Sequence, residues 1–207
     1  MGTRGAIGIR FNKVDKISYN HFDSYPEGLG VEFVKDVAKL MKDFGQEALT
    51  RFFPEIRMVN EGDKPTKDEI KRFKVFSKDN VGNGDDWYSL LRGAQGSLYK
   101  GVVIRVMTEN AAFMHDSLFC EWAYIFNLDT MKIEVYRGFQ KKAFKGRYSK
   151  AAEKAEKGST QYYGVKLVAE IPVATKGMEK AMLEVGKQVS KAEEEQYKKE
   201  ELERQTA

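Results

Sequence analysis

Short runs of apolar residues open the chain and predict a β-hairpin. Residues 6–11 and 14–19 are rich in strand formers and are separated by a polar two-residue turn. After a loop, apolar residues recur at three- and four-residue spacing over residues 30–44, which predicts a helix with one apolar face. Gly45 suits the left-handed conformation that ends many helices.

The middle of the chain mixes short elements with loops. Residues 46–53 predict a second helix, and Thr66 with Glu69 has the spacing of a capping box at the start of a third. Residues 78–97 contain four glycines, so we expect a loop with one helical turn around residues 87–91. Residues 102–107 form a short apolar run, which predicts a buried strand.

A second hairpin is the clearest strand signal. Residues 119–126 and 131–136 flank a four-residue turn, and apolar and polar residues alternate along the second arm. Residues 163–171 predict a further strand. Hairpins with interspersed helices predict one α+β domain over residues 1–176, with a largely antiparallel sheet and packed helices. Residues 177–207 become amphipathic and then highly charged, which predicts a C-terminal helix.

Composition narrows the class of protein. The 207 residues are 42% hydrophobic and 12% aromatic, enough to form a core. A net charge of +4 is compatible with a nucleic-acid partner without requiring one. Cys120 is the only cysteine, so we expect no intrachain disulfide and a cytoplasmic location. No apolar run approaches the roughly 20 residues of a membrane span. We also expect neither a cofactor nor a metal.

Residues 19–30 (YNHFDSYPEGLG) gather polar side chains directly after a strand, where a rigid scaffold presents a loop. His21 titrates near neutral pH and is a candidate acid–base group that Asp23 would orient. Hydrogen bonds from these side chains to the loop backbone are the alternative, since Asn, Asp and Ser are common turn residues. The candidate catalytic residues here are Asn20, His21 and Asp23, and the candidate binding residues are Ser24 and Tyr25.

A similar set of polar residues precedes the second hairpin. His115 and Asp116 lie at the entrance to the strand, and Glu121 and Trp122 follow as candidate binding residues. If this segment lay beside residues 19–30, the histidines and aspartates of the two would form a metal or acid–base cluster. Cys120 lies in an apolar run, which favours a small buried side chain over a catalytic thiolate.

Residues 139–150 (FQKKAFKGRYSK) interleave cations with aromatic rings. Cations neutralise phosphates and rings stack on bases, so this composition suits a single-stranded nucleic acid. An ordinary solvated basic surface is the alternative, because mixed charge continues beyond the segment. The candidate binding cations are Lys141, Lys142, Lys145 and Arg147.

Residues 1–8 (MGTRGAIG) and 19–30 form one motif, and residues 116–124 (DSLFCEWAY) with 136–139 (YRGF) form a second. Together these motifs resemble an uncharacterised family of proteins from bacteriophages, bacteria and fungi, over the chain from its start to about residue 171. The resemblance implies a phage-encoded protein in the host cytoplasm and brings no established activity.

Some members of that family begin Met-Cys-Thr-Arg-Gly, and removal of the methionine would leave an N-terminal cysteine on a strand. This start is similar to that of N-terminal-nucleophile amidohydrolases, in which the terminal amine acts as base to its own side chain. The resemblance implies their layered architecture as one expectation. Here Gly2 has no nucleophile, so Thr3, with Arg4 beside it, is the weak candidate and would need further processing.

The sequence therefore predicts a non-enzymatic interaction protein with a protein or nucleic-acid partner. The N-terminal motif, the basic segment and the C-terminal helix are the candidate contact regions. An N-terminal-nucleophile-like amidohydrolase, or its inactive relative, is the alternative. Convergence of residues 19–30 and 115–122 on a pocket would favour the enzyme.

Overall fold

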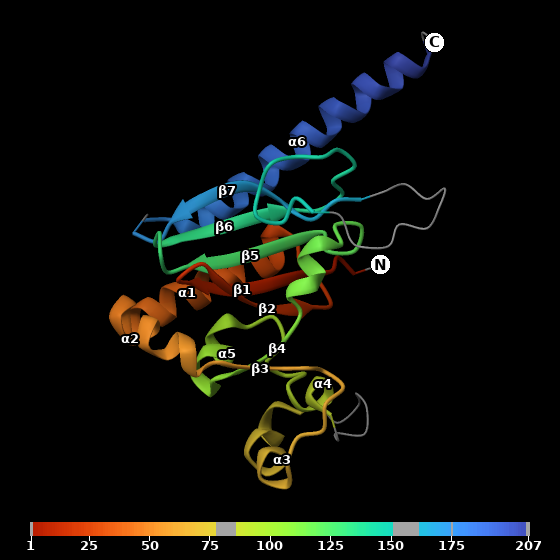
Figure 1. The fold of residues 1–207 in the computed structure, drawn as a ribbon. Helices are drawn as coiled ribbons and strands as arrows, with labels where there is room; N and C mark the ends of the chain where they lie inside the picture. Colours follow the sequence, from red (N-terminus) through yellow and green to blue (C-terminus); the bar gives the residue numbers. More distant parts are fainter. Residues whose placement is uncertain (1, 78–85, 151–161, 175, 206–207) are drawn as a thin grey trace.

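Five strands form a mixed sheet in the order β2-β1-β5-β6-β7 (Figure 1). The strands of this sheet are β1 (Gly5–Phe11), β2 (Val14–Asn20), β5 (Trp122–Asn127), β6 (Lys132–Arg137) and β7 (Lys166–Pro172). The structure is a computed structural model that describes residues 2–77, 86–150, 162–174 and 176–205. Neighbouring strands pair antiparallel, except that β1 and β5 run parallel. The predicted α+β class, with a largely antiparallel sheet and packed helices, is confirmed.

Helices connect the strands and follow the last of them, and the final helix is the predicted charged C-terminal helix. The helices are α1 (Val31–Asp43), α2 (Gly45–Phe52), α3 (Lys67–Phe73), α4 (Trp87–Leu90), α5 (Leu98–Ile104) and α6 (Met178–Gln205). Single helical turns are η1 (Pro26–Gly30), η2 (Phe53–Glu55), η3 (Lys74–Phe76) and η4 (Ala111–His115). Within the described ranges, no helix is both long enough and apolar enough to cross a membrane.

The two hairpins of the sheet support each other through their turns. Asn12 and Lys13 both take positive φ angles, 49° and 64°, as a tight turn between β1 and β2 requires. The carboxylate of Asp129, in the turn between β5 and β6, accepts hydrogen bonds from the N–H groups of Asn12 (2.8 Å) and Lys13 (3.1 Å). Both predicted hairpins are confirmed, and their turns are joined.

The main core lies on the face of the sheet that packs against α1, α5 and the first half of α6. Ile7, Ile9 and Tyr124 alternate along β1 and β5 with side chains on this face, and each is at most 2% exposed. Phe33 of α1 packs on them, and burial of each such side chain contributes about 1.5–3 kcal/mol. Met182 of α6 belongs to the same core, whereas the second half of α6 projects away from the sheet (Figure 1).

A smaller core lies on the opposite face, under η4 and residues 139–150. Met114 of η4 is fully buried there. Tyr148 packs against Tyr136 of β6, with ring centroids 5.3 Å apart. Part of the basic segment therefore belongs to the core and is not a freely solvated surface.

A second, two-stranded sheet lies beside β2. Its strands are β3 (Arg57–Val59) and β4 (Val106–Thr108), which pair in parallel. Ser18 of β2 and Thr108 of β4 share a hydrogen bond (2.6 Å), and the N–H of Asn110 donates to the carbonyl oxygen of Ile17 (2.9 Å). These contacts cover the outer edge of β2.

The prediction of a strand over residues 102–107 is wrong in its first half, because α5 continues to residue 104. The Ser97 hydroxyl caps α5 by accepting a hydrogen bond from the N–H of Lys100 (3.3 Å), and Arg105 ends it at a φ of 60°. Only the residues after this turn form β4. A short apolar run does not by itself distinguish a strand from a buried helix.

Predictions that rested on local signals are confirmed. The helix predicted over residues 46–53 is α2, which begins at Gly45, with a φ of 71°, and ends at Phe52. The capping box is present, since the Thr66 hydroxyl accepts a hydrogen bond from the N–H of Glu69 (3.3 Å) and the Glu69 carboxylate accepts one from the N–H of Thr66 (2.7 Å). Residues 78–85 of the predicted loop lie outside the described residues.

Candidate functional site

The two sequence motifs meet at one end of the sheet. Gly5, at the start of β1, lies opposite both Asn20, at the end of β2, and Trp122, at the start of β5. The loop after β2 and the segment before β5 are therefore neighbours, although about a hundred residues separate them in the chain. Figure 1 places the N-terminus at this same end of the sheet.

Backbone hydrogen bonds join the motifs through the residues before β1. The N–H of Ser24 donates to the carbonyl oxygen of Thr3 (3.1 Å), and the N–H of Glu121 donates to that of Arg4 (3.1 Å). The Tyr124 hydroxyl donates to the carbonyl oxygen of Ser24 (2.9 Å). A Cβ at Gly5 would lie 2.4 Å from the carbonyl oxygen of the residue opposite it on β5, so only glycine fits.

Several candidate residues hold the loop and do not reach the surface. The Asn20 amide donates to the Ser24 hydroxyl (2.9 Å) and to the carbonyl oxygen of Phe22. Ser24 is fully buried and Trp122 is 6% exposed, so neither side chain is available to a partner in this conformation. Asp23 is exposed and takes a φ of 50°, a left-handed turn position that Asp tolerates. The side chains of Asn20 and Ser24 therefore form hydrogen bonds within the loop, which is the alternative to a catalytic or binding role.

His21 pairs with a tyrosine and not with Asp23. Its Nδ1 atom lies 2.7 Å from the Tyr19 hydroxyl oxygen. Burial, together with the positive charges of Arg92 and Arg4, lowers the pKa of His21 below its usual value. The imidazole is therefore neutral near pH 7, in a positive local field.

The predicted histidine–aspartate cluster does not form. Among the described residues, no group of three or more His, Cys, Asp and Glu side chains is placed to hold a metal ion. His115 packs instead against the Tyr148 ring, and its Nδ1 atom lies 3.3 Å from the carbonyl oxygen of Lys150. Cys120 is fully buried, and burial raises the pKa of its thiol well above the usual range, as the core prediction for this residue implied.

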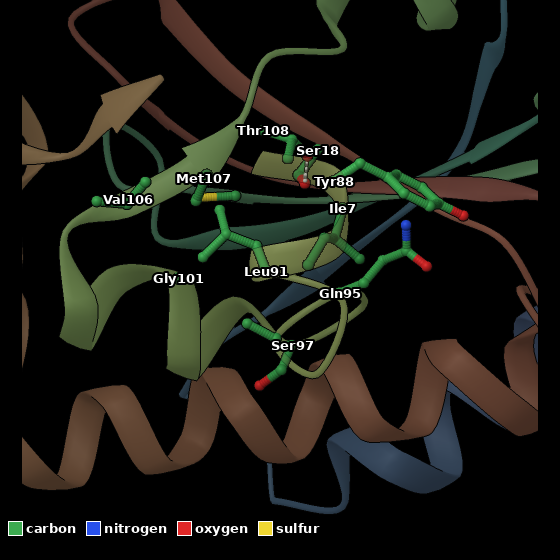
Figure 2. A pocket seen from close by; sticks show the side chains of 11 residues that line it. Ile7, Ser18, Tyr88, Leu91, Gln95, Ser97, Gly101, Val106, Met107 and Thr108 are labelled. Carbon is green, nitrogen blue, oxygen red and sulfur yellow. Dashed lines mark hydrogen bonds between the residues drawn. The ribbon is translucent and has the colours of Figure 1, made fainter. Parts of the chain in front are cut away.

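Two cavities lie elsewhere. A cavity of about 20 Å³ between β1, β2 and the α4–α5 region has Ser18, Tyr88 and Gln95 among its lining residues (Figure 2). This volume holds about one water molecule. A larger cavity, about 230 Å³, lies between β7 and α6. Ile7 lines the smaller cavity, but no residue of 19–30 or 115–122 lines either one, so these two segments meet at a junction of backbone and not at either cavity.

Exposed aromatic rings with arginines over them surround this junction. Phe22 is 55% exposed and Phe119 is 46% exposed. The Arg92 guanidinium carbon lies 5.7 Å from the centre of the Phe22 ring, and that of Arg4 lies 5.4 Å from the Phe119 ring. We call these four residues the aromatic–arginine surface.

The arginines of this surface have no carboxylate partner. Within the part of the chain that the structure describes, neither Arg4 nor Arg92 forms an ion pair. Both are close enough to His21 to lower its pKa, so the two cations share one region. Arg4 is exposed, whereas Arg92 is half-buried and its guanidinium donates a hydrogen bond to the side-chain oxygen of Gln95. A guanidinium without an ion pair is available to bind a phosphate or a carboxylate of a partner.

The basic segment continues from this surface and then turns inward. The N–H of Phe139 donates to the carbonyl oxygen of Ser117 (2.7 Å), two residues before Phe119. Lys141, Lys142 and Lys145 are exposed. Arg147 differs from these lysines, because its guanidinium donates to both carboxylate oxygens of Glu134 (2.7 and 2.9 Å). Arg147 therefore anchors the segment to the sheet in this conformation.

Sequence reasoning missed Arg92 and the two phenylalanines of the surface. Arg92 lies in a glycine-rich loop without a motif, and its position beside Phe22 depends on the fold around α4. Phe22 and Phe119 lie inside the motifs but are apolar, so the search for polar chemistry passed over them. Their exposure was the missing signal, and a sequence pattern does not report it.

Comparisons with protein-family models, with curated proteins and with solved structures found no match. The resemblance of the motifs to a phage, bacterial and fungal family therefore stays a prediction, as does the cytoplasmic location. Function is inferred from the geometry and charge of the site.

Proposed function

We propose that this protein binds single-stranded nucleic acid at the aromatic–arginine surface and performs no catalysis there. The observation that supports this function is the position of Arg4 and Arg92, which form no ion pair with any described residue, over the exposed rings of Phe119 and Phe22. Guanidinium groups neutralise phosphates, and exposed rings stack on unpaired bases. Both requirements of single-strand binding are met at one end of the sheet.

The neighbouring basic segment extends this surface. Phe139 is 38% exposed, and the guanidinium carbon of Arg137 lies 4.7 Å from its ring centre. Arg137 itself is paired with Glu193 of α6 (2.7 Å), so Phe139 contributes its ring and not a free cation. Lys141, Lys142 and Lys145 follow on the exposed side. A strand of nucleic acid that crossed the aromatic–arginine surface would meet these lysines next, as the composition of residues 139–150 predicts.

A protein partner is the other class of ligand to consider, because arginine and aromatic residues are also common in protein interfaces. The two classes differ in salt dependence. Contacts to phosphate release condensed counterions, so affinity for nucleic acid falls steeply between roughly 50 and 200 mM salt. Among the described residues neither Arg4 nor Arg92 forms an ion pair, although the Glu121 carboxylate accepts a hydrogen bond from the N–H of Arg4 (3.3 Å), and unpaired guanidinium groups favour an anionic ligand.

The proposal is tested by fluorescence anisotropy with labelled oligo-dT and oligo-U about 12 nucleotides long, a typical length for such sites. Each lost phosphate contact reduces the slope of log K against log salt by about 0.7, so the Arg4→Ala/Arg92→Ala double variant is expected to reduce it by about 1.4. Arg51→Ala is the matched control, since Arg51 is exposed on α2 and is 3.7 Å from Glu47. Absence of binding, or an unchanged slope in the double variant, contradicts the proposal. Salt-independent capture of a protein instead would favour a protein partner.

The amidohydrolase alternative has weaker support. Thr3 would be its nucleophile, but among the described residues no hydrogen bond reaches the Thr3 hydroxyl. Its carbonyl oxygen is already bonded to the N–H of Ser24 (3.1 Å). The mass of the purified protein decides this alternative, because the mechanism requires a chain that begins at Thr3.

A further inference from the structure

The two edges of the main sheet differ in what covers them. Contacts from β4 and Asn110 cover the edge of β2, whereas no described residue forms a backbone hydrogen bond on the outer side of β7. The N–H of Val173 donates inward to the carbonyl oxygen of Met131 (3.0 Å). Because bonding directions alternate along an antiparallel strand, the backbone groups of Glu170 face outward. Figure 1 shows β7 at the edge farthest from β2, beside α6.

An apolar groove runs along this open edge. Ala169 and Ile171 of β7, with Ala181 and Val185 of α6, line the cavity of about 230 Å³. Glu184 lies on its rim, and no cation of the described residues forms an ion pair with it. A strand added beside β7 would lie about 4.8 Å away, and every second side chain would point to the α6 side, where the groove lies.

A peptide of another protein suits this edge better than a second copy of the chain. The register between β6 and β7 shifts between Val135 and Tyr136, and β7 ends at Pro172. A bulge and a proline both limit the long, regular pairing that joins two sheet edges into a dimer. A short peptide needs only a few of the backbone groups, and the groove supplies a site for one of its side chains.

We propose that the edge of β7 binds an extended peptide segment of a partner protein as an added strand. An apolar side chain of the peptide occupies the groove between β7 and α6, and a basic side chain on the same face lies beside Glu184. Leu167 and Val168, 43% and 38% exposed, are covered by the same strand. This site is distinct from the aromatic–arginine surface and does not depend on nucleic-acid binding.

The probe is a capped peptide of the sequence TKTVTKT, which as a strand presents its valine and both lysines on one face. It is titrated into ¹⁵N-labelled full-length protein and followed by amide chemical shifts. Shifts are expected over residues 166–172 and along α6 near Ala181. Ala181→Leu fills the groove and is expected to weaken binding by about tenfold, equivalent to about 1.4 kcal/mol. Ala192→Leu makes the same change on the exposed part of α6 and is expected to leave binding unchanged.

Glu184→Lys gives a second test that does not disturb the core, because Glu184 is exposed. It is expected to weaken binding of the cationic peptide several-fold, and more so at low salt. Absence of shifts at about 1 mM peptide, or equal binding by the Ala181→Leu variant, overturns the proposal. A wild-type dimer that Val168→Lys dissociates also overturns it, since the edge would then join two copies. The Arg4→Ala/Arg92→Ala variant is expected to bind the peptide normally, which separates this proposal from the nucleic-acid function.

Discussion

Two clusters of arginine and aromatic side chains lie on this molecule, and they differ in whether carboxylates accompany the cations. In the first, which we call the closed cluster, Arg147 and Tyr148 contact Glu134 and Asp15 on one face of the sheet. The second is the aromatic–arginine surface, where neither Arg4 nor Arg92 forms an ion pair with a carboxylate of the described residues. The difference separates arginines that stabilise the fold from arginines available to a ligand.

The closed cluster satisfies its buried groups completely. The Glu134 side chain is 4% exposed, and it accepts hydrogen bonds from Arg147, from the Asn127 amide (2.7 Å) and from the Tyr136 hydroxyl (2.7 Å). Burial alone would raise the pKa of Glu134, but these three partners hold it below its usual value. The carboxylate is charged at neutral pH and serves to anchor residues 139–150.

The largest effect that distinguishes the clusters is expected in stability. Glu134→Ala leaves Asp15, 3.6 Å away, as the remaining carboxylate of Arg147 and removes the acceptor of the Asn127 amide and the Tyr136 hydroxyl, which is expected to lower the free energy of unfolding by about 3 kcal/mol. Arg4→Ala, on the exposed surface, is expected to change it by less than about 0.5 kcal/mol. Urea unfolding followed by circular dichroism measures both values. A loss of less than about 1 kcal/mol in Glu134→Ala would mean that the closed cluster is not a stabilising anchor.

An intermediate effect is expected in binding. Phe22→Ala removes one ring of the aromatic–arginine surface and is expected to weaken oligonucleotide binding by about tenfold, since stacking contributes about 1–3 kcal/mol per base. Tyr197→Ala is the control, because Tyr197 is a 65% exposed aromatic residue on the projecting half of α6. Anisotropy titrations at one salt concentration compare the variants. If Phe22→Ala and Tyr197→Ala weakened oligonucleotide binding equally, the aromatic–arginine surface would have no specific role in binding.

The smallest effect is a shift in the titration of His21. Burial and the charges of Arg92 and Arg4 lower its pKa in the free protein. Arg92→Ala removes one repelling cation and is therefore expected to raise the pKa of His21, and a bound oligonucleotide is expected to raise it too. NMR titration of the imidazole protons of His21 measures the shift. A pKa that falls on oligonucleotide binding would show that no phosphate lies near these arginines.

The sequence predictions succeeded where the interactions concerned join residues that are close together in the chain. The capping box of Thr66 and Glu69 was predictable because its partners are three residues apart. The hairpins were predictable because turn residues and alternation are local signals. The strand expected over residues 102–107 was partly wrong, because the Ser97 cap and the turn at Arg105 decide between helix and strand there.

The same contrast between local and long-range interactions applies to the candidate site. The sequence identified residues 19–30 and 115–122 as unusual, and it offered the alternative that loop hydrogen bonds explain their polar side chains. It did not indicate that Arg4 and Glu121, 117 residues apart, exchange hydrogen bonds at one end of the sheet. It also gave Arg147 and Lys141 equal standing, although only Arg147 has a buried carboxylate to bind.

By itself, then, the sequence determined the elements of this protein, since spacing, capping and turn chemistry act over a few residues. Only the tertiary structure decided which cations are neutralised. The parallel pairing of β1 with β5 brings the two motifs together, and the packing of residues 139–150 brings Arg147 to Glu134. Whether an arginine side chain contacts a carboxylate or solvent depends on how strands that are distant in the chain pack together. No local sequence pattern indicates that packing.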